Sequence, residues 1–360
     1  GGIVRRLSVR QPALLLLPAA LLALVLAQVS SRFVSFLQQP FFTLSITEWV
    51  ADLLLAIFFF IAGAELKSEF DNDRSATHIL TPLLGALGGM AFPALLYLVS
   101  AHTLSATTSA WGVPMATDLP IALALVALSH RISSGTRMFL LALAIFDDIG
   151  SILVIALRFT HEFSWTWGGL ILLGALTFFV TARRGFSSTI LFLIGATVWY
   201  CFYQSGIHPT VAGALLGVLM PAGRSSRAIS FWTPISNYCV LPLFVFTALA
   251  IPLSFSWQSI SNPIVVSLIF ARMVGKPLGI MFGILIAQKI FRMKKALALS
   301  EYLLVAILGT VGFSVSLLFA ELSLTGVEKS AAVLGILLTL PFAIGLSVYA
   351  LKRYSNSTTS

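Results

Sequence analysis

Long apolar runs, separated by short polar connections, follow one another along the whole chain of 360 residues. A helix that crosses a membrane needs about 20 mostly apolar residues, and most of these runs reach that length. The runs lie at about residues 13–29, 47–64, 79–100, 111–129, 136–157, 165–182, 187–203, 207–220, 236–252, 262–286, 303–322 and 331–351. We therefore expect an all-α polytopic membrane protein with about 12 transmembrane helices.

The composition supports this class and excludes others. Apolar residues make up 58% of the chain and charged residues 10%, against roughly 45–50% and about 25% in soluble domains. Such a chain is neither a soluble nor a disordered protein, and its two cysteines are too few for a disulfide scaffold. The runs leave no room for a sizeable aqueous domain, so we expect a single transmembrane domain over residues 1–360, with a disordered tail at 358–360.

The basic residues indicate the topology. If the N-terminus is cytoplasmic, 17 of the 22 basic residues fall on the cytoplasmic side, three fall outside, and two lie within a span. The 17 are Arg5, Arg6, Arg10, Lys67, Arg74, Arg131, Arg137, Arg183, Arg184, Arg224, Arg227, Lys289, Arg292, Lys294, Lys295, Lys352 and Arg353. This asymmetry follows the positive-inside rule, so both termini are expected in the cytoplasm. The net charge of +9 therefore reflects topology and not nucleic-acid binding. The first run could instead be a secretory signal peptide, although it lacks a clear cleavage site.

Five ionisable residues lie deep inside apolar runs: Asp118, Asp147, Asp148, Arg272 and Lys276. Each costs about 2.5–3.5 kcal/mol at the centre of a membrane helix, so each is a candidate functional residue. The alternative is that they neutralise one another as structural salt bridges. Adjacent helical residues point about 100° apart, so one lysine cannot easily pair with both Asp147 and Asp148. One carboxylate then remains for a proton or a metal cation.

Two runs contain residues that interrupt a helix. Pro114 and Pro120 flank Thr117 and Asp118 in the fourth run, and Gly309-Thr310-Val311-Gly312 lies in the eleventh. Proline removes a backbone donor and disfavours helix before it. Unwound backbone at membrane depth is tolerated only where it lines a cavity or is buried in protein, and paired interruptions in two halves of a transporter mark its binding site. A simple kink is the alternative interpretation.

A pocket of this kind suits Na⁺ or Li⁺, with the aspartates, the Thr117 hydroxyl and freed carbonyls as ligands. The sequence lacks the His and Cys spacing of a transition-metal site, and no cofactor is expected. Burial and a neighbouring carboxylate both raise the pKa of an aspartate. A proton and a sodium ion can then compete for the same oxygens, which is the requirement for exchange.

The strings ATDLPIALALVALSHR, FLLALAIFDDIGSILVIAL, GKPLGI and GFSVSLLFA, in this order, resemble the NhaA-type sodium/proton antiporters of bacterial inner membranes. FFFIAGAELKSEF, GGMAFPALLYL, SGIHPTVAGALLG and LPLFVF extend the resemblance from about residue 47 to 350. The resemblance implies twelve helices, an inverted-topology repeat that relates spans 3–5 to spans 10–12, and discontinuous helices 4 and 11. It also implies a role in pH homeostasis and salt tolerance.

The resemblance also implies roles for individual residues. Asp147 and Asp148 match the ion- and proton-binding pair, with Na⁺ held together with Thr117. Thr117 and Asp118 match the broken-helix motif, and Lys276 matches the lysine that pairs with a carboxylate and offsets helix dipoles. The two positions linked to pH response are Glu65 and His208, for which a solvated helix end or a capping role is the alternative.

Three features depart from the family pattern. The connection from about 30 to 46 looks short for the external β-hairpin through which the family dimerises, which makes a homodimer uncertain. The segment 225–237 lacks the acid and histidines associated there with pH sensing. Arg272 stands where an apolar residue is expected, four positions before Lys276 and on the same helix face. If Arg272 holds a carboxylate permanently, the number of protons exchanged changes.

The expected function is export of cytoplasmic Na⁺ or Li⁺ in exchange for external protons, and not catalysis. The expected partners are these ions and membrane lipid. An alternative is symport of an organic anion with Na⁺, with Arg272 as the partner of the anion. A more distant alternative is an intramembrane aspartyl protease that uses Asp118 and one aspartate of the pair, although the sequence lacks the Tyr-Asp and Gly-x-Gly-Asp patterns of such enzymes.

Overall fold

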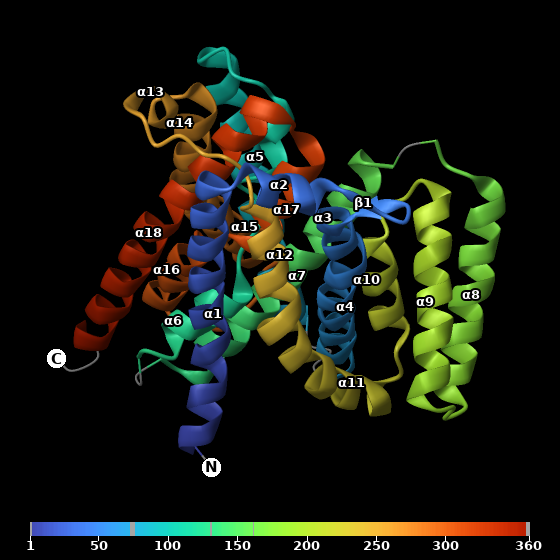
Figure 1. Cartoon of the computed structure of the whole chain (residues 1–360). Coiled ribbons are helices and arrows are strands. Elements are labelled where there is room, and N and C mark those ends of the chain that lie inside the picture. Colours follow the sequence, from blue (N-terminus) through green and yellow to red (C-terminus); the bar gives the residue numbers. More distant parts are fainter. Residues whose placement is uncertain (1, 73–75, 130–131, 161, 358–360) are drawn as a thin grey trace. The chain divides into compact units, whose positions relative to one another are not determined.

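The computed structural model describes residues 2–72, 76–129, 132–160 and 162–357, and these residues are predominantly α-helical (Figure 1). Arg74, Arg131 and the polar tail at 358–360 lie outside the described residues. The only strands in the described part of the chain are two of two residues each. The expected all-α class is therefore confirmed at the level of secondary structure.

Seven helical segments of the described residues are long and apolar enough to cross a membrane. They are Ile46–Asp71, Ile79–Thr103, Ser134–Arg158, Trp165–Arg183, Ala222–Ala248, Pro263–Lys289 and Gly326–Asn356. An eighth is added if Leu15–Val29 and Ser31–Gln38, bent by 111° at their junction, are one span. The count is lower than the twelve apolar runs because the fourth, eighth and eleventh runs form helices of only 8 to 10 residues. The seventh run forms a helix of 18 residues, Ser188–Ser205, which is not among the seven segments.

The chain divides into two compact units. The first unit comprises residues 1–31, 75–147 and 248–360. Its elements are α1 (Gly2–Val29), α5 (Ala76–Thr103), η2 (Ser109–Gly112), α6 (Leu119–Val126), most of α7 (Ser134–Arg158), α13 (Trp257–Ile260), α14 (Pro263–Phe270), η4 (Ala271–Gly275), α15 (Lys276–Lys289), α16 (Leu299–Leu308), α17 (Ser314–Ser323) and α18 (Gly326–Ser357). Two of its helices, α5 and α15, pack so closely that a Cβ on Gly88 or on Gly279 would collide with the backbone of the other residue. Glycine therefore sets the distance between these helices.

Two stretches of the first unit are not helical. Residues 113–118 separate η2 from α6, and residues 309–313 separate α16 from α17. The first stretch ends at Asp118, which caps the N-terminus of α6, and Pro120 lies in the first turn of that helix, where its missing N–H costs nothing. Each stretch therefore places free backbone N–H and C=O groups inside a buried region, and these groups need partners.

The second unit comprises residues 32–74 and 148–247. Its elements are most of α2 (Ser31–Gln38), β1 (Pro40–Phe41), β2 (Leu44–Ser45), α3 (Ile46–Trp49), η1 (Val50–Leu54), α4 (Leu55–Asn72), the end of α7, α8 (Trp165–Arg183), α9 (Ser188–Ser205), α10 (Thr210–Leu219), α11 (Ala222–Ile235), η3 (Ser236–Val240) and α12 (Leu241–Ala248). Its apolar core includes Phe178, Val198, Phe202 and Leu216. The short helix α10 packs against α4, where a side chain on Gly213 would collide with the Ala56 carbonyl.

The connection between the first two apolar runs differs from the expectation. We expected it to be too short for a β-hairpin, and this was wrong, because β1 pairs antiparallel with β2. Two residues suffice for the turn, since Phe42 adopts a positive φ of 62°, and Ser45 ends the hairpin by capping α3 in a capping box with Glu48. Phe42 stands at the tip and is 85% exposed.

Candidate ion-binding site

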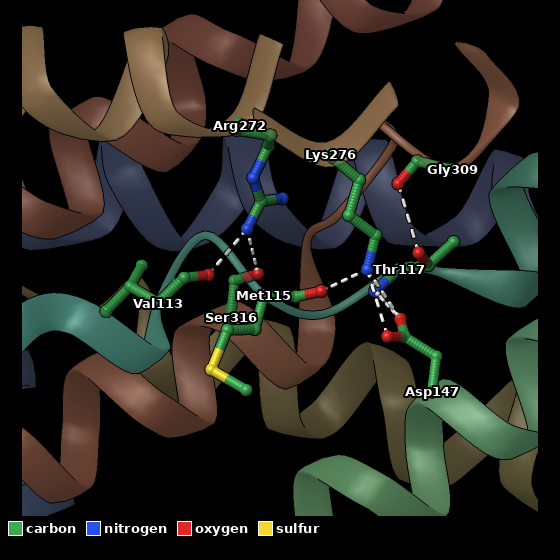
Figure 2. Close-up of polar contacts among 8 residues, drawn as sticks. All are labelled: Val113, Met115, Thr117, Asp147, Arg272, Lys276, Gly309 and Ser316. Carbon is green, nitrogen blue, oxygen red and sulfur yellow. Dashed lines mark hydrogen bonds and ion pairs between the residues drawn. The ribbon is translucent and has the colours of Figure 1, made fainter. Parts of the chain in front are cut away.

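A buried ion pair lies at the centre of the first unit. The Lys276 ammonium lies 2.8 Å and 3.0 Å from the two carboxylate oxygens of Asp147, as Figure 2 shows. Lys276 also donates a hydrogen bond to the Met115 carbonyl in the first non-helical stretch. Both charged side chains are almost completely inaccessible, at 0% and 1% exposed. Removing either partner would leave an uncompensated buried charge.

Thr117 joins this ion pair to both non-helical stretches. Its backbone N–H donates to Asp147 Oδ2 over 2.7 Å, and its hydroxyl donates to the Gly309 carbonyl over 3.0 Å. The hydroxyl oxygen keeps lone pairs that can accept a proton or coordinate a cation. Oxygen atoms from a carboxylate, a hydroxyl and two carbonyls therefore converge around Lys276 and Thr117 (Figure 2).

The Asp118 carboxylate accepts hydrogen bonds from the N-termini of two helices, α6 and α17. Its Oδ1 accepts from the Ile121 N–H at the start of α6, and its Oδ2 accepts from both the backbone N–H (3.0 Å) and the hydroxyl (2.7 Å) of Ser314 at the start of α17. Its own N–H donates to the Val311 carbonyl over 2.7 Å. A negative charge at a helix N-terminus is favoured by the helix dipole. This arrangement supports a charge-compensating role for Asp118 more directly than a role as an open ion ligand.

Arg272 is buried within the same unit and does not reach solvent. It lies in η4, one turn before Lys276, and is 3% exposed. Its Nη2 donates to the Val113 carbonyl over 2.6 Å and to the Ser316 hydroxyl, so it bridges the first non-helical stretch and α17 (Figure 2). The two basic residues thus bind carbonyls that follow η2, where a positive charge is favourable.

Asp148 follows Asp147 on α7 and is equally buried. A helix turns by about 100° per residue, so the two carboxylates leave α7 in different directions. The boundary between the two compact units falls between these two residues. The Asp147–Lys276 ion pair belongs to the first unit, and Asp148 is the first residue of α7 in the second unit.

The two pH-response candidates lie in the second unit. His208 Nε2 lies 3.4 Å from Asp52 Oδ1, and His208 Nδ1 shares a hydrogen bond of 2.7 Å with the Thr210 hydroxyl. Glu65 follows Asp52 by 13 residues along η1 and α4, which is about 20 Å of helical rise. Glu65 and His208 therefore do not form one cluster.

Sequence reasoning missed several partners of the candidate residues. Ser314 and Ser316, which bind Asp118 and Arg272, were visible only as the Ser-x-Ser that follows the Gly309–Gly312 interruption. Asp52 lies near the start of the apolar run 47–64, and nothing in the sequence links it to His208. Among the described residues, no group of three or more His, Cys, Asp or Glu side chains is placed to hold a metal ion. The oxygens at Asp147 and Thr117 instead offer the hard ligands that an alkali cation prefers.

Comparison with known proteins identifies the family. Residues 7–351 match the Na⁺/H⁺ antiporter 1 family. The chain belongs to this family. Among its relatives, the Na⁺/H⁺ antiporter NhaA 1 of Clostridium beijerinckii is 33% identical over 337 residues, covering 87% of this chain and 83% of that protein. The NhaA antiporter of Pelagibacter ubique is 33% identical over 372 residues, covering 94% and 95%. Members of the Na⁺/H⁺ antiporter 1 family are multi-pass membrane transporters and not enzymes, which excludes the protease alternative and disfavours the symporter.

The fold comparison agrees. The sodium/proton antiporter MjNhaP1 of Methanocaldococcus jannaschii superimposes with a TM-score of 0.56 over 97% of this chain and 100% of that chain, at 13% identity. At this identity the likeness concerns the fold alone. It shows that this member of the Na⁺/H⁺ antiporter 1 family shares a helical architecture with a distant antiporter.

Proposed function

We propose that the protein exports Na⁺ or Li⁺ from the cytoplasm in exchange for external protons, with Asp147, Asp148 and Thr117 as the groups that bind the cation. The observation that carries this proposal is the Asp147–Lys276 ion pair, buried against Thr117 between two non-helical stretches. Membership of the Na⁺/H⁺ antiporter 1 family supports Na⁺ and H⁺ as the exchanged ions. The positions of these side chains support the choice of residues.

The ion pair couples cation binding to proton release. Asp147 is already neutralised by Lys276, so a sodium ion that binds the Asp147 oxygens must displace the ammonium. An unpaired ammonium inside the membrane is costly, and it becomes neutral by losing its proton. Protons that arrive from the external side restore the ammonium, which pairs with Asp147 again, and protonate Asp148, and these two steps release the sodium ion. Asp148 therefore alternates between a proton and the cation, and Asp147 alternates between the ammonium and the cation.

We also propose the complete topology that the sequence favours. It comprises twelve spans in one transporter domain, an inverted repeat of spans 3–5 and 10–12, and discontinuous spans 4 and 11. Two observations support it: the interruptions at 113–118 and 309–313 are joined by Thr117 and Asp118, and 17 of 22 basic residues fall on one side. Both termini would then be cytoplasmic in a bacterial inner membrane.

A homodimer in the lipid bilayer is the proposed assembly. The hairpin of β1 and β2 supports it, because Phe41 and Phe42 are exposed at its tip, 62% and 85% respectively. Exposed aromatic side chains of this kind suit an interface or the headgroup region of a membrane. His208 and Glu65 remain the proposed contributors to pH response.

The test is proton movement in everted membrane vesicles with a pH-sensitive dye. Addition of Na⁺ or Li⁺ to vesicles with an acidic interior should release protons when the parent protein is present. Asp148→Asn should abolish the response, whereas Glu328→Gln, a change of an exposed acid at the start of α18, should preserve it. An Asp148→Asn protein that exchanges as well as the parent would refute the assignment of the site.

A further inference from the structure

Arg272 is a second buried cation beside the ion pair, and the exchange mechanism above does not use it. Its neighbour Lys276 changes partner or protonation state during exchange, whereas a guanidinium remains charged under all relevant conditions. Arg272 is held from two sides, by the Val113 carbonyl and the Ser316 hydroxyl. Its position is therefore set by groups that neither carry nor exchange ions.

Gly312 leaves the space that the guanidinium of Arg272 occupies. A Cβ added to Gly312 would collide with Nη1 of Arg272 and would lie only 2.7 Å from its Cζ. The same Cβ would also collide with the Ala116 carbonyl. The guanidinium therefore packs directly on the backbone of both non-helical stretches, at a point where only glycine leaves enough space.

The buried ionisable side chains of the first unit, among the residues that the structure describes, are two acids and two bases. Asp118 and Asp147 are the acids, and Arg272 and Lys276 are the bases, so their formal charges balance only if Arg272 is counted. The charge of Arg272 interacts with both carboxylates. An apolar residue at position 272 would leave this group of side chains with one net negative charge, which would attract cations more strongly.

We propose that Arg272 is a positioning residue for exchange that joins the two non-helical stretches and, as a permanent positive charge, lowers the affinity of the neighbouring carboxylates for sodium ions. This inference rests on the proposed function. Its physical basis is that a fixed cation opposes the binding of Na⁺ and of H⁺ to the same oxygens. The protein then releases its cargo more readily and requires a higher sodium concentration for half-maximal exchange.

In the part of the chain that the structure describes, two basic side chains on elements packed against η4 are already paired with carboxylates. The elements packed against η4 include α5, α14, α15 and α18. Tyr97 on α5 is a neutral phenol, and Lys329 at the start of α18 is paired with Glu321 over 2.5 Å. On α15 the relevant group is Lys276, which is already engaged by Asp147. Arg272 therefore adds a positive charge that is not part of the Asp147–Lys276 ion pair.

The experiment compares Arg272→Gln with Arg272→Lys in everted vesicles. Arg272→Gln removes the charge and keeps a hydrogen-bond donor, so we expect the sodium concentration for half-maximal exchange at alkaline pH to fall by roughly tenfold. The pH of half-maximal activity should rise as well, because protons also bind more tightly. Arg272→Lys should restore the parental values of both quantities to within about threefold. Ser316→Ala, which removes a hydrogen-bond partner but no charge, should change the sodium affinity by less than about twofold.

The outcomes separate a charge effect from a purely structural one. If Arg272→Gln retains the parental sodium affinity and pH profile, the proposal is overturned. It is also overturned if Arg272→Lys behaves like Arg272→Gln, or if Ser316→Ala reproduces the shift, because the hydrogen bonds and not the charge would then matter. Should Arg272→Gln fail to accumulate as a folded protein, Arg272→Met replaces it as the neutral variant in the same comparison. A parent protein without sodium-dependent exchange would refute the proposed function itself, which is a different result from an active parent with an unchanged variant.

Discussion

Both units bury ionisable side chains among apolar helices, but they do so in different ways. In the first unit, Asp147–Lys276 and Asp118 lie at stretches of backbone that are not helical. In the second, Asp52 lies in the helical segment η1, and His208 lies in the short connection between α9 and α10. Free backbone groups contact the charged side chains of Lys276 and Asp118 and stabilise their full charges. His208 needs no such partner for a charge, because a histidine can become neutral by losing one proton. We therefore expect the first unit to depend on its charges for its structure.

The strongest test of this difference is the removal of Lys276. Lys276→Met leaves the Asp147 carboxylate buried without its counter-charge, and we expect the free energy of unfolding to fall by about 3–5 kcal/mol and exchange to cease. The measurement is thermal unfolding of the purified protein in detergent, together with the vesicle assay. The control is Lys329→Met, because the Lys329–Glu321 pair is partly exposed and should contribute less than about 1 kcal/mol.

A double variant sharpens the same test. Lys276→Met combined with Asp147→Leu removes both charges, so most of the lost stability should return while exchange remains absent. If the double variant is no more stable than Lys276→Met, burial of an unpaired charge is not the cause of the loss.

Gly312→Ala tests whether the close contact between the non-helical stretches matters. The added Cβ has no room between Arg272 and the Ala116 carbonyl, so we expect a loss of about 2–3 kcal/mol in unfolding free energy and slower exchange. Gly345→Ala on α18 is the matched control, since no atom lies within 4 Å of a Cβ at that position. Equal melting temperatures for the two alanine variants would contradict the close packing.

The second unit should tolerate loss of its buried pair better. His208→Gln keeps hydrogen-bonding capacity but removes the only partner of this pair that can become positively charged. We expect a loss of about 1–2 kcal/mol and retained exchange, with an altered pH profile. The vesicle assay over a range of pH measures this directly. A loss of exchange as complete as that of Lys276→Met would remove the distinction between the two units.

The smallest expected effect concerns Glu301, which precedes the apolar run 303–322 at the start of α16. Burial alone would raise its pKa, but hydrogen bonds from the Ala298 N–H and from the hydroxyls of Thr136, Ser133 and Tyr354 lower the pKa below its ordinary value of 4.5. A carboxyl with a lowered pKa stabilises the folded state fully above its unfolded pKa and loses that contribution as the pH falls through the folded value.

Glu301→Gln should therefore reduce stability by about 1 kcal/mol at neutral pH, and the difference from the parent should disappear below about pH 4. Unfolding midpoints measured at pH 7 and below pH 4 provide the comparison. Glu321→Gln is the control, because this acid makes a single partly exposed ion pair. A Glu301→Gln variant whose deficit is the same at both pH values would show that the carboxylate charge is not responsible.

The sequence predicted local features of the backbone better than it predicted contacts between distant residues. The prolines at 114 and 120 do flank non-helical backbone, and the resemblance implied that Lys276 pairs with a carboxylate, which in the structure is Asp147. These expectations follow from local rules or from the family motif. The contact of Asp118 with Ser314 joins residues 196 positions apart, and no periodicity or spacing reports such a distance.

Other differences have equally physical reasons. The β1–β2 hairpin was missed because it uses only two residues per strand and a phenylalanine at positive φ, a conformation that is uncommon for such a residue. The pairing of His208 with Asp52 depends on the close packing of α10 against α4. Glycines such as Gly213 permit this packing, because a side chain at that position would collide with the backbone of α4. The role of Arg272 was left open because its orientation depends on Val113 and Ser316, which lie in two other parts of the chain.

The shared use of Asp118 by two helices also has a consequence for the order of folding. The N-terminus of α17 receives its carboxylate acceptor from a residue 196 positions earlier, so that end of the helix is completed only after a very large loop has closed. Contacts of such high sequence separation form slowly. We therefore expect α17 to be among the last segments of the first unit to become protected from hydrogen exchange during refolding, together with the interface of α5 and α15, where Gly88 and Gly279 are 191 positions apart.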